Sequence, residues 1–424
     1  MTISSPKHSP EIARRHFLQH LARSSAIAAP AWTLMSSLQA KAAEVHKNKK
    51  ALILLWMGGG PATIDMWDMK PGSTTGGPFQ PIATSADVQI CEHLPLMAKQ
   101  MHHMAIVRSM STREADHTRG RYYMHTGFVP NPNVEHPSYG ALVAQQLEKT
   151  RSDLEIPPFI SVGGNSIGPG FLGMAYAPFA VDSNGRIRNL KMETEQNRFK
   201  ERMELLDRIE SRFIDQQRGD APKEHAKIVK KTERLLTSEQ MDAFQVAQEP
   251  ENVQETYGDT DFGRGCLLAR RLVESGVPIV EVELGGWDTH NNNFTSLETK
   301  LPEMDQAMAA LVADLSDRGM LDDVAILWLG EFGRTPRING STGRDHWARS
   351  WSAVVGGAGF KRGIAVGSTS QDGTEIETTP YSSEDLMATV LKSIGIPLDI
   401  RFTATNGRPM KIAAGGRPID ELLA

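Results

Sequence analysis

The segment at residues 324–347 constrains the fold more than any other part of the sequence. It begins with six consecutive apolar residues, VAILWL, that end at Gly330. A short run of this kind, rich in β-branched residues and bounded by glycine, is typical of a strand buried on both faces of a parallel sheet. Ligands of open α/β sheets bind beyond the carboxyl ends of the strands. The segment therefore predicts a site directly after residue 329.

Charged and imidazole side chains are concentrated at that point. Glu331 and Arg334 follow the apolar run, and Asp345 and His346 follow a glycine-rich turn. A buried carboxylate or imidazole is costly unless it is paired or bound to a metal, so such a concentration indicates a site. The alternative is a salt-bridged loop, in which Arg334 and Arg344 neutralise Glu331 and Asp345.

Strand and helix patterns alternate along the rest of the chain. Further strands are expected at residues 50–57, 104–108, 159–162, 277–284 and 352–355, and helices at residues 116–127, 137–149, 263–275, 299–319 and 383–394. This alternation predicts an α/β/α sandwich with a mostly parallel central sheet covered on both faces. Residues 189–248 are highly charged and rich in helix-forming residues, which indicates a helical insertion within one domain at 44–424. The net charge of −5 gives no support for a nucleic-acid partner.

The first 43 residues are interpreted as a twin-arginine signal peptide. Arg14 and Arg15 precede a weakly apolar stretch, and Ala40-Lys41-Ala42 resembles a small-x-small cleavage site. The stretch is short and interrupted by Pro30, so no stable membrane span is expected. We expect export by the twin-arginine route to the periplasm or the medium. A charged amphipathic tail is the alternative.

Polar residues follow several of the expected strands. The first strand runs into three glycines and then Asp65 and Asp68, but the spacing of a phosphate-binding loop is missing, so a nucleotide site is rejected. His117 follows the second strand, and Asp288 and His290 follow the strand at 277–284. Carboxylates and imidazoles at one sheet edge form a mixed nitrogen and oxygen ligand set. Such a set suits zinc, manganese, iron, magnesium or calcium. The alternative for His117 and His346 is that each is an ordinary core histidine.

Four motifs carry a resemblance to a known family: MGGGPATIDMWD, GGWDTHNN, GEFGRTPRIN and GRDHW. Together they resemble the secreted bacterial family called domain of unknown function 1501, which is grouped with the alkaline phosphatase and sulfatase superfamily. The resemblance covers residues 51–398. It implies an alkaline-phosphatase-like fold with two metal ions at the sheet edge.

The resemblance also implies roles for particular residues. One metal would be held by Asp288, His290 and His346, and the other by Glu331 with Asp65 or Asp68. Asp345 belongs to the same candidate ligand set.

His117 stands at the superfamily's nucleophile position, where cysteine, serine or threonine is expected. It is interpreted as a metal ligand, with a phosphohistidine-forming nucleophile and a structural cap as the alternatives. Arg334 or Arg119 would clamp an anion.

The function expected from these observations is an exported, metal-dependent hydrolase of phosphate or sulfate esters. Its substrate would be a small-molecule or polysaccharide anionic ester. The alternative is a non-catalytic metal- or glycan-binding protein on the same scaffold, because the nucleophile position holds histidine. The sequence does not indicate the oligomeric state.

Overall fold

The computed structural model describes residues 50–187, 196–216 and 221–424, which belong to one unit of the chain. The expected signal peptide at residues 1–43 lies outside the described residues. Within the described part of the chain, no helix combines the length and the apolar character needed to cross a membrane.

The described residues form an eight-stranded central sheet. All of its strands run parallel to one another except β11, which is antiparallel to both of its neighbours. The prediction of a mostly parallel sheet is therefore confirmed. In spatial order the strands are β12 (Ile364–Val366), β4 (Met104–Met110), β11 (Trp351–Gly357), β8 (Val324–Leu329), β1 (Ala51–Met57), β7 (Ile279–Leu284), β5 (Phe159–Val162) and β6 (Phe179–Val181).

The reversed direction of β11 matters for the site. Because β11 is antiparallel to β8, its first residue lies at the edge where the neighbouring parallel strands end. The residues just before β11 therefore reach the same edge as the loops that follow β7 and β8.

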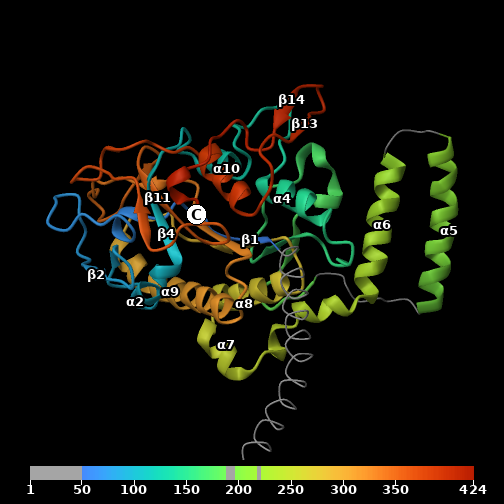
Figure 1. The fold of residues 1–424 in the computed structure, drawn as a ribbon, viewed down its shortest axis with the longest axis horizontal. Helices are drawn as coiled ribbons and strands as arrows, with labels where there is room; N and C mark the ends of the chain where they lie inside the picture. The colour runs from blue at the N-terminus through green and yellow to red at the C-terminus, as the bar shows by residue number, and fades with distance from the viewer. Residues whose placement is uncertain (1–49, 188–195, 217–220) are drawn as a thin grey trace, which may run out of the picture. The chain divides into compact units, whose positions relative to one another are not determined.

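Side chains of alternating sequence positions face opposite sides of the sheet. In β1, Ile53 and Leu55 join one core, while Leu52 and Trp56 join the other. Figure 1 shows helices on both sides of the sheet. The first core includes residues of α2 (Pro95–Gln100), α8 (Asp261–Glu274) and α9 (Asn293–Asp317), and the second includes residues of α3 (His117–Thr126), α4 (Tyr139–Glu148) and α10 (Ser383–Ser393). The helix α7 (Glu251–Tyr257) packs against α8 and α9.

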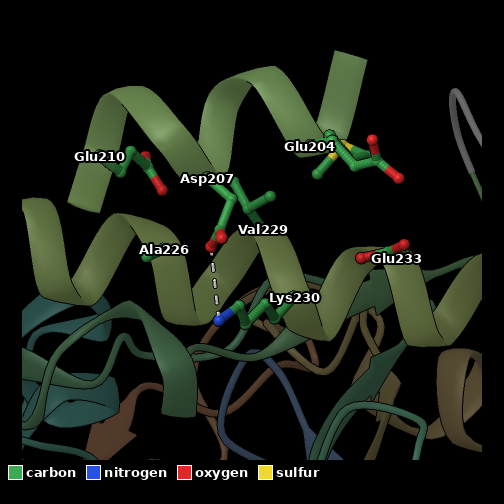
Figure 2. Close-up of a pocket in the computed structure, with 8 residues that line it drawn as sticks. Glu204, Asp207, Glu210, Ala226, Val229, Lys230 and Glu233 are labelled. Atoms are coloured by element: carbon green, nitrogen blue, oxygen red, sulfur yellow. Dashed lines mark ion pairs between the residues drawn. The ribbon is translucent and has the colours of Figure 1, made fainter. Parts of the chain in front are cut away.

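Two long helices fall within the range expected for the charged insertion. They are α5 (Gln196–Asp215) and α6 (Ala221–Thr237), which pack against each other. Figure 2 shows the pocket between them, where Asp207 of α5 forms an ion pair with Lys230 of α6 at 3.5 Å. Lys231 of α6 pairs with Glu148 at the end of α4.

Short two-stranded sheets complete the described fold. They join β2 (Pro81–Ala83) to β3 (Gln89–Cys91), β9 (Gly333–Arg334) to β10 (His346–Trp347), and β13 (Arg401–Thr403) to β14 (Pro409–Lys411). The pairing of β9 with β10 places His346 opposite Arg334.

Candidate metal centre

Four segments bring polar side chains together at the carboxyl edge of the sheet. The segments are the loop after β7, the loop after β8, the segment before β11 and the first turn of α3. Most of the residues expected from the sequence meet there: His117, Asp288, His290, Glu331, Asp345 and His346.

His117 is the first residue of α3, as the sequence predicted. The side chain of Asp116 caps the helix by accepting a hydrogen bond from the backbone amide of Arg119 at 3.0 Å. The helix ends at Gly127, whose φ of 75° is the left-handed conformation that glycine adopts without strain. The two ends of the helix therefore determine where His117 meets the sheet edge.

Three imidazole nitrogens converge on one carboxylate oxygen. The Nε2 atoms of His117, His290 and His346 lie 3.3, 3.2 and 3.4 Å from Oδ1 of Asp288. The Nε2 atoms of His290 and His346 are 3.0 Å apart. In a tetrahedral zinc site with ligands at about 2.0–2.1 Å, the ligand atoms are separated by roughly 3.3 Å. Ligand atoms of His117, His346 and Asp288 all lie within 4.8 Å of one another and could hold one ion, and Nε2 of His290 lies beside this group.

The other nitrogen of each ring is held by an acceptor. Nδ1 of His117 lies 2.6 Å from Glu331, and Nδ1 of His290 lies 2.7 Å from Asp345. Nδ1 of His346 lies 2.7 Å from the carbonyl oxygen of residue 115. Such acceptors place the proton on Nδ1 and leave the Nε2 lone pair available, which is the usual arrangement around metal-binding histidines. Glu331 and Asp345, expected as ligands, thus contact histidine rings.

Two buried atoms of this cluster make no hydrogen bond within the described residues: Nε2 of His117 and Oε2 of Glu331. A buried polar atom without a partner costs about 1–3 kcal/mol. A divalent ion bound to Nε2 of His117 would remove that cost for the ring nitrogen. The residues present therefore fit a metal ion.

The electrostatics of the rings follow from their surroundings. The hydrogen bond with Glu331 is the main reason that the pKa of His117 is raised. Burial lowers the pKa of His346. The phenyl ring of Phe332 packs against both rings, with centroid distances of 5.1 Å to His117 and 4.7 Å to His346. One aromatic side chain thus supports two of the three imidazoles.

Arg334 holds Asp288 in place. Its buried guanidinium donates to Asp288 at 2.5 Å, to the carbonyl oxygens of Gly60 and Arg344 at 2.7 and 3.2 Å, and to that of Gly59. Burial alone would raise the pKa of Asp288, but Arg334 and the neighbouring histidines lower it to about 2. The guanidinium is bonded on every nitrogen, and the expected role of Arg334 as an anion clamp stays a prediction.

The glycine-rich loop after β1 supports the same groups. The amide of Gly59 donates to Oε1 of Glu331 at 3.0 Å. Gly60 has a φ of 70°, and a Cβ atom there would lie 2.7 Å from the ring of Phe332. Glycine is required at this point because the backbone approaches the site so closely.

Asp65 and Asp68, expected in a second metal site, have other partners. Both carboxylate oxygens of Asp65 are bonded to the buried guanidinium of Arg344, at 2.6 and 2.7 Å. Asp68 pairs with Lys70 at 3.0 Å and accepts from the hydroxyl of Thr369. In this structure both carboxylates have protein partners, and their roles as ligands of a second ion stay a prediction.

Arg119 is also placed differently from the expectation. Its guanidinium forms two hydrogen bonds with Glu114, at 2.7 and 2.8 Å, and half of its side chain is exposed. The expected role of Arg119 as an anion clamp likewise stays a prediction. The alternative of a salt-bridged loop predicted other partners for the two arginines. Arg334 pairs with Asp288, and Arg344 pairs with Asp65. The expected partners were Glu331 and Asp345.

Sequence reasoning missed a neighbouring polar network. On later turns of α3, Arg121 pairs with Glu283 at 2.8 and 2.9 Å, and His125 contacts Glu281 at 3.2 Å. Ser166 donates to the other oxygen of Glu281 at 2.5 Å. The signal was present, because two glutamates interrupt an otherwise apolar strand in VPIVEVEL.

A family model matches residues 49–423. The chain belongs to the family described as Protein of unknown function (DUF1501). This confirms the family indicated by the four motifs. Among curated proteins, none matches the sequence.

Solved structures with a similar fold include a sulfatase and a protein in the alkaline phosphatase superfamily. The PsFucS1 sulfatase from Pseudoalteromonas sp. is 14% identical, with 85% of this chain and 70% of that chain covered and a TM-score of 0.40. A protein in the alkaline phosphatase superfamily from Vibrio parahaemolyticus is 13% identical, with 89% and 71% covered and a TM-score of 0.37. The periplasmic domain of EcEptC from Escherichia coli, solved in complex with Zn, is 9% identical, with 82% and 83% covered and a TM-score of 0.37. At such low identity, the site has to be interpreted from its own geometry.

Proposed function

We propose that the protein is an exported, metal-dependent hydrolase of phosphate or sulfate esters. One observation carries the proposal: three imidazoles, each held through Nδ1, direct Nε2 at a single carboxylate. His117, His290, His346 and Asp288 would hold one divalent ion. When bound, such an ion polarises an ester oxygen and lowers the pKa of water.

The ligand set favours some metals over others. Three imidazoles and one carboxylate suit zinc or iron, whereas magnesium and calcium prefer sites made of oxygen ligands. Arg334 would keep Asp288 ionised and oriented. Glu331 and Asp345 would set the tautomer and the direction of the rings they contact, which is the role of carboxylates behind metal-binding histidines.

The role of His117 determines the attacking group. If Nε2 of His117 is a ligand, it is not available as a nucleophile, so water is proposed to attack the phosphorus or sulfur atom. The bond to the ester oxygen then breaks, and the alcohol leaves after gaining a proton. Trapping of a phosphohistidine at His117 would contradict this assignment.

The test is metal analysis of the purified protein followed by an ester panel. We expect about one or two divalent ions per chain and hydrolysis of 4-nitrophenyl phosphate or 4-nitrophenyl sulfate. His290→Ala should lose both, whereas His102→Gln, which changes an exposed histidine outside the cluster, should lose neither. Metal-free wild-type protein with unchanged stability in chelator would contradict the proposal.

A second candidate is supported by one observation. His117 occupies the position where the superfamily is expected to have a hydroxyl or thiol nucleophile, so the protein could have kept the scaffold as a metal- or glycan-binding protein. Under this alternative the metal analysis gives the same result, but every ester in the panel remains intact at all metal loadings.

Export remains part of the proposal, and it rests on Arg14 and Arg15. Replacing both with lysine should leave precursor in the cytoplasm. Normal export of the double variant would contradict the twin-arginine route.

A further inference from the structure

The helix α5 of the charged insertion exposes a row of apolar side chains. On one face of the helix, Asp207 and Glu210 line the pocket that α5 forms with α6 (Figure 2). On another face, Leu205, Ile209 and Phe213 are between 39% and 59% exposed, and they are three of the six large apolar side chains exposed within the described residues. Because they are four residues apart, they form one row along the helix, which we call the α5 stripe. Exposed apolar side chains gathered in this way indicate an interaction site.

Arginines share the face of the α5 stripe. An α-helix turns by about 100° per residue, which places Arg198, Arg202 and Arg212 within about 60° of Ile209 around the helix axis. All three are exposed. Within the described residues of α5, no carboxylate falls in that arc. Arg198 and Arg212 form no ion pair with another described residue. The stripe is therefore bordered by positive charge.

The other charged side chains described on α5 do not cancel this charge. Glu201 and Arg208 lie about 80° and 100° from Ile209 on the same side of the helix, so they offset each other. The remaining carboxylates lie about 100° to 160° from Ile209, away from the stripe. They are Glu204, Asp207, Glu210 and Asp215.

The position of α5 leaves the stripe accessible. The helix packs on α6, and α6 contacts the rest of the domain at residues 174–176 and at Glu148. Figure 1 shows α6 between α5 and the central sheet. The arginines and the stripe together cover residues 198–213, a length of about 22 Å along the helix. An extended surface can therefore contact the whole row.

The charge of this face restricts what can cover it. A second copy of the chain would present the same arginines, so like charges would meet. An anionic surface would neutralise them instead. Arginines beside a row of leucine, isoleucine and phenylalanine are typical of helices that lie in the interface of an anionic membrane. There the apolar side chains enter the boundary of the acyl chains, and the long arginine side chains reach the lipid phosphates.

We propose that α5 binds the surface of a membrane that contains anionic lipids. The α5 stripe enters the interface, and the arginines beside it contact lipid phosphates. The protein is then held at the surface of the bilayer through one face of one helix. This inference does not depend on the proposed hydrolase function, because none of these residues belongs to the metal centre.

Cosedimentation of the purified protein with lipid vesicles tests the inference. We expect binding to vesicles of phosphatidylglycerol and phosphatidylcholine, and binding at least about tenfold weaker to vesicles of phosphatidylcholine alone. Arg198→Gln combined with Arg212→Gln should lower the affinity for the anionic vesicles about 25-fold, which is about fivefold per arginine. Leu205→Ser combined with Ile209→Ser should lower it about tenfold. Circular dichroism checks that both variants keep the fold.

Arg401→Gln combined with Arg408→Gln is the matched control, since it removes the same charge from exposed positions in the β13–β14 hairpin. Its vesicle binding should equal that of the wild type. No vesicle binding by the wild type, or an equal loss in the control, would overturn the inference. A wild-type dimer in sedimentation velocity that Leu205→Ser with Ile209→Ser dissociates would overturn it in favour of a second copy. Binding of poly-glutamate but not of vesicles would overturn it in favour of an acidic protein.

Discussion

His117 and His125 lie at opposite ends of one helix and have different surroundings. Each ring contacts a glutamate: His117 contacts Glu331, which follows β8, and His125 contacts Glu281, which lies within β7. At His125 both nitrogens are occupied, because Nδ1 also contacts the carbonyl oxygen of Arg121 at 2.8 Å. At His117 only Nδ1 is occupied, and Nε2 makes no hydrogen bond within the described residues. The exposed fraction of the side chain is 35% for His117 and 3% for His125.

The comparison separates these two rings. Nε2 of His125 contacts the buried carboxylate of Glu281, whereas Nε2 of His117 makes no hydrogen bond within the described residues and is open to an ion. Two carboxylates differ in the same way. Asp65 is buried with both oxygens bonded to Arg344, while Asp288 is bonded to Arg334 through one oxygen and is 48% exposed.

The largest effect is expected for His125→Ala. This change leaves the buried carboxylate of Glu281 without its imidazole partner, so unfolding should become easier by about 3–5 kcal/mol. Metal content should be unchanged in the fraction that folds. Urea denaturation and metal analysis measure the two effects, and loss of metal without loss of stability would reverse the assignment of the two histidines.

His117→Gln should produce the opposite result. We expect metal affinity to fall by about 100-fold or more, at least as large a loss as for changes behind metal ligands, and folding to remain intact because Asp116 still caps the helix. Chelator competition gives the affinity, and circular dichroism checks the fold. Full occupancy and activity in this variant would exclude both chemical roles of His117.

Asp345→Asn should have a smaller effect on the same measurement. The carboxylate contacts Nδ1 of His290, and this hydrogen bond is the main reason that the pKa of Asp345 is lowered. Removing the charge should reduce metal affinity by about 10-fold to 100-fold. Asp372→Asn, which changes a half-buried carboxylate that accepts hydrogen bonds within another loop, serves as the matched control. Equal effects of the two changes would argue against a specific role for Asp345.

The smallest effect concerns the pH dependence of stability. Burial alone would raise the pKa of Glu281, but His125, Ser166 and Arg121 together lower it below the ordinary value of 4.5. A carboxylate whose pKa is lower in the folded than in the unfolded state contributes its full stabilisation when the pH is above the pKa of the unfolded state. This contribution is lost as the pH falls through the pKa of the folded state. Glu281→Gln should therefore lose less stability than the wild type between pH 5 and about pH 3, measured as Tm in chelator. An equal fall in the Tm of the wild type and of the variant as the pH is lowered would contradict this assignment.

The sequence was sufficient for the fold and for most members of the cluster. Apolar runs such as residues 324–329 located the strands, and polar residues directly after them located the sheet edge. The ion pairs and hydrogen bonds between side chains could not be predicted from the sequence in this way. Asp65 and Arg344 are 279 positions apart, and no local pattern distinguishes this pair from Asp288 with Arg334. The Nδ1 contacts of the histidines depend on ring orientations that only the folded chain determines.

Anomalous diffraction from crystals of the purified protein, recorded at the absorption edge of its metal, tests the central claim most directly. We expect a peak at about 2.0–2.2 Å from the Nε2 atoms of His117, His290 and His346 and from a carboxylate oxygen of Asp288. A peak at Asp65 or Asp68 instead, or no peak with the Nε2 atoms of His290 and His346 still 3.0 Å apart, would contradict the claim.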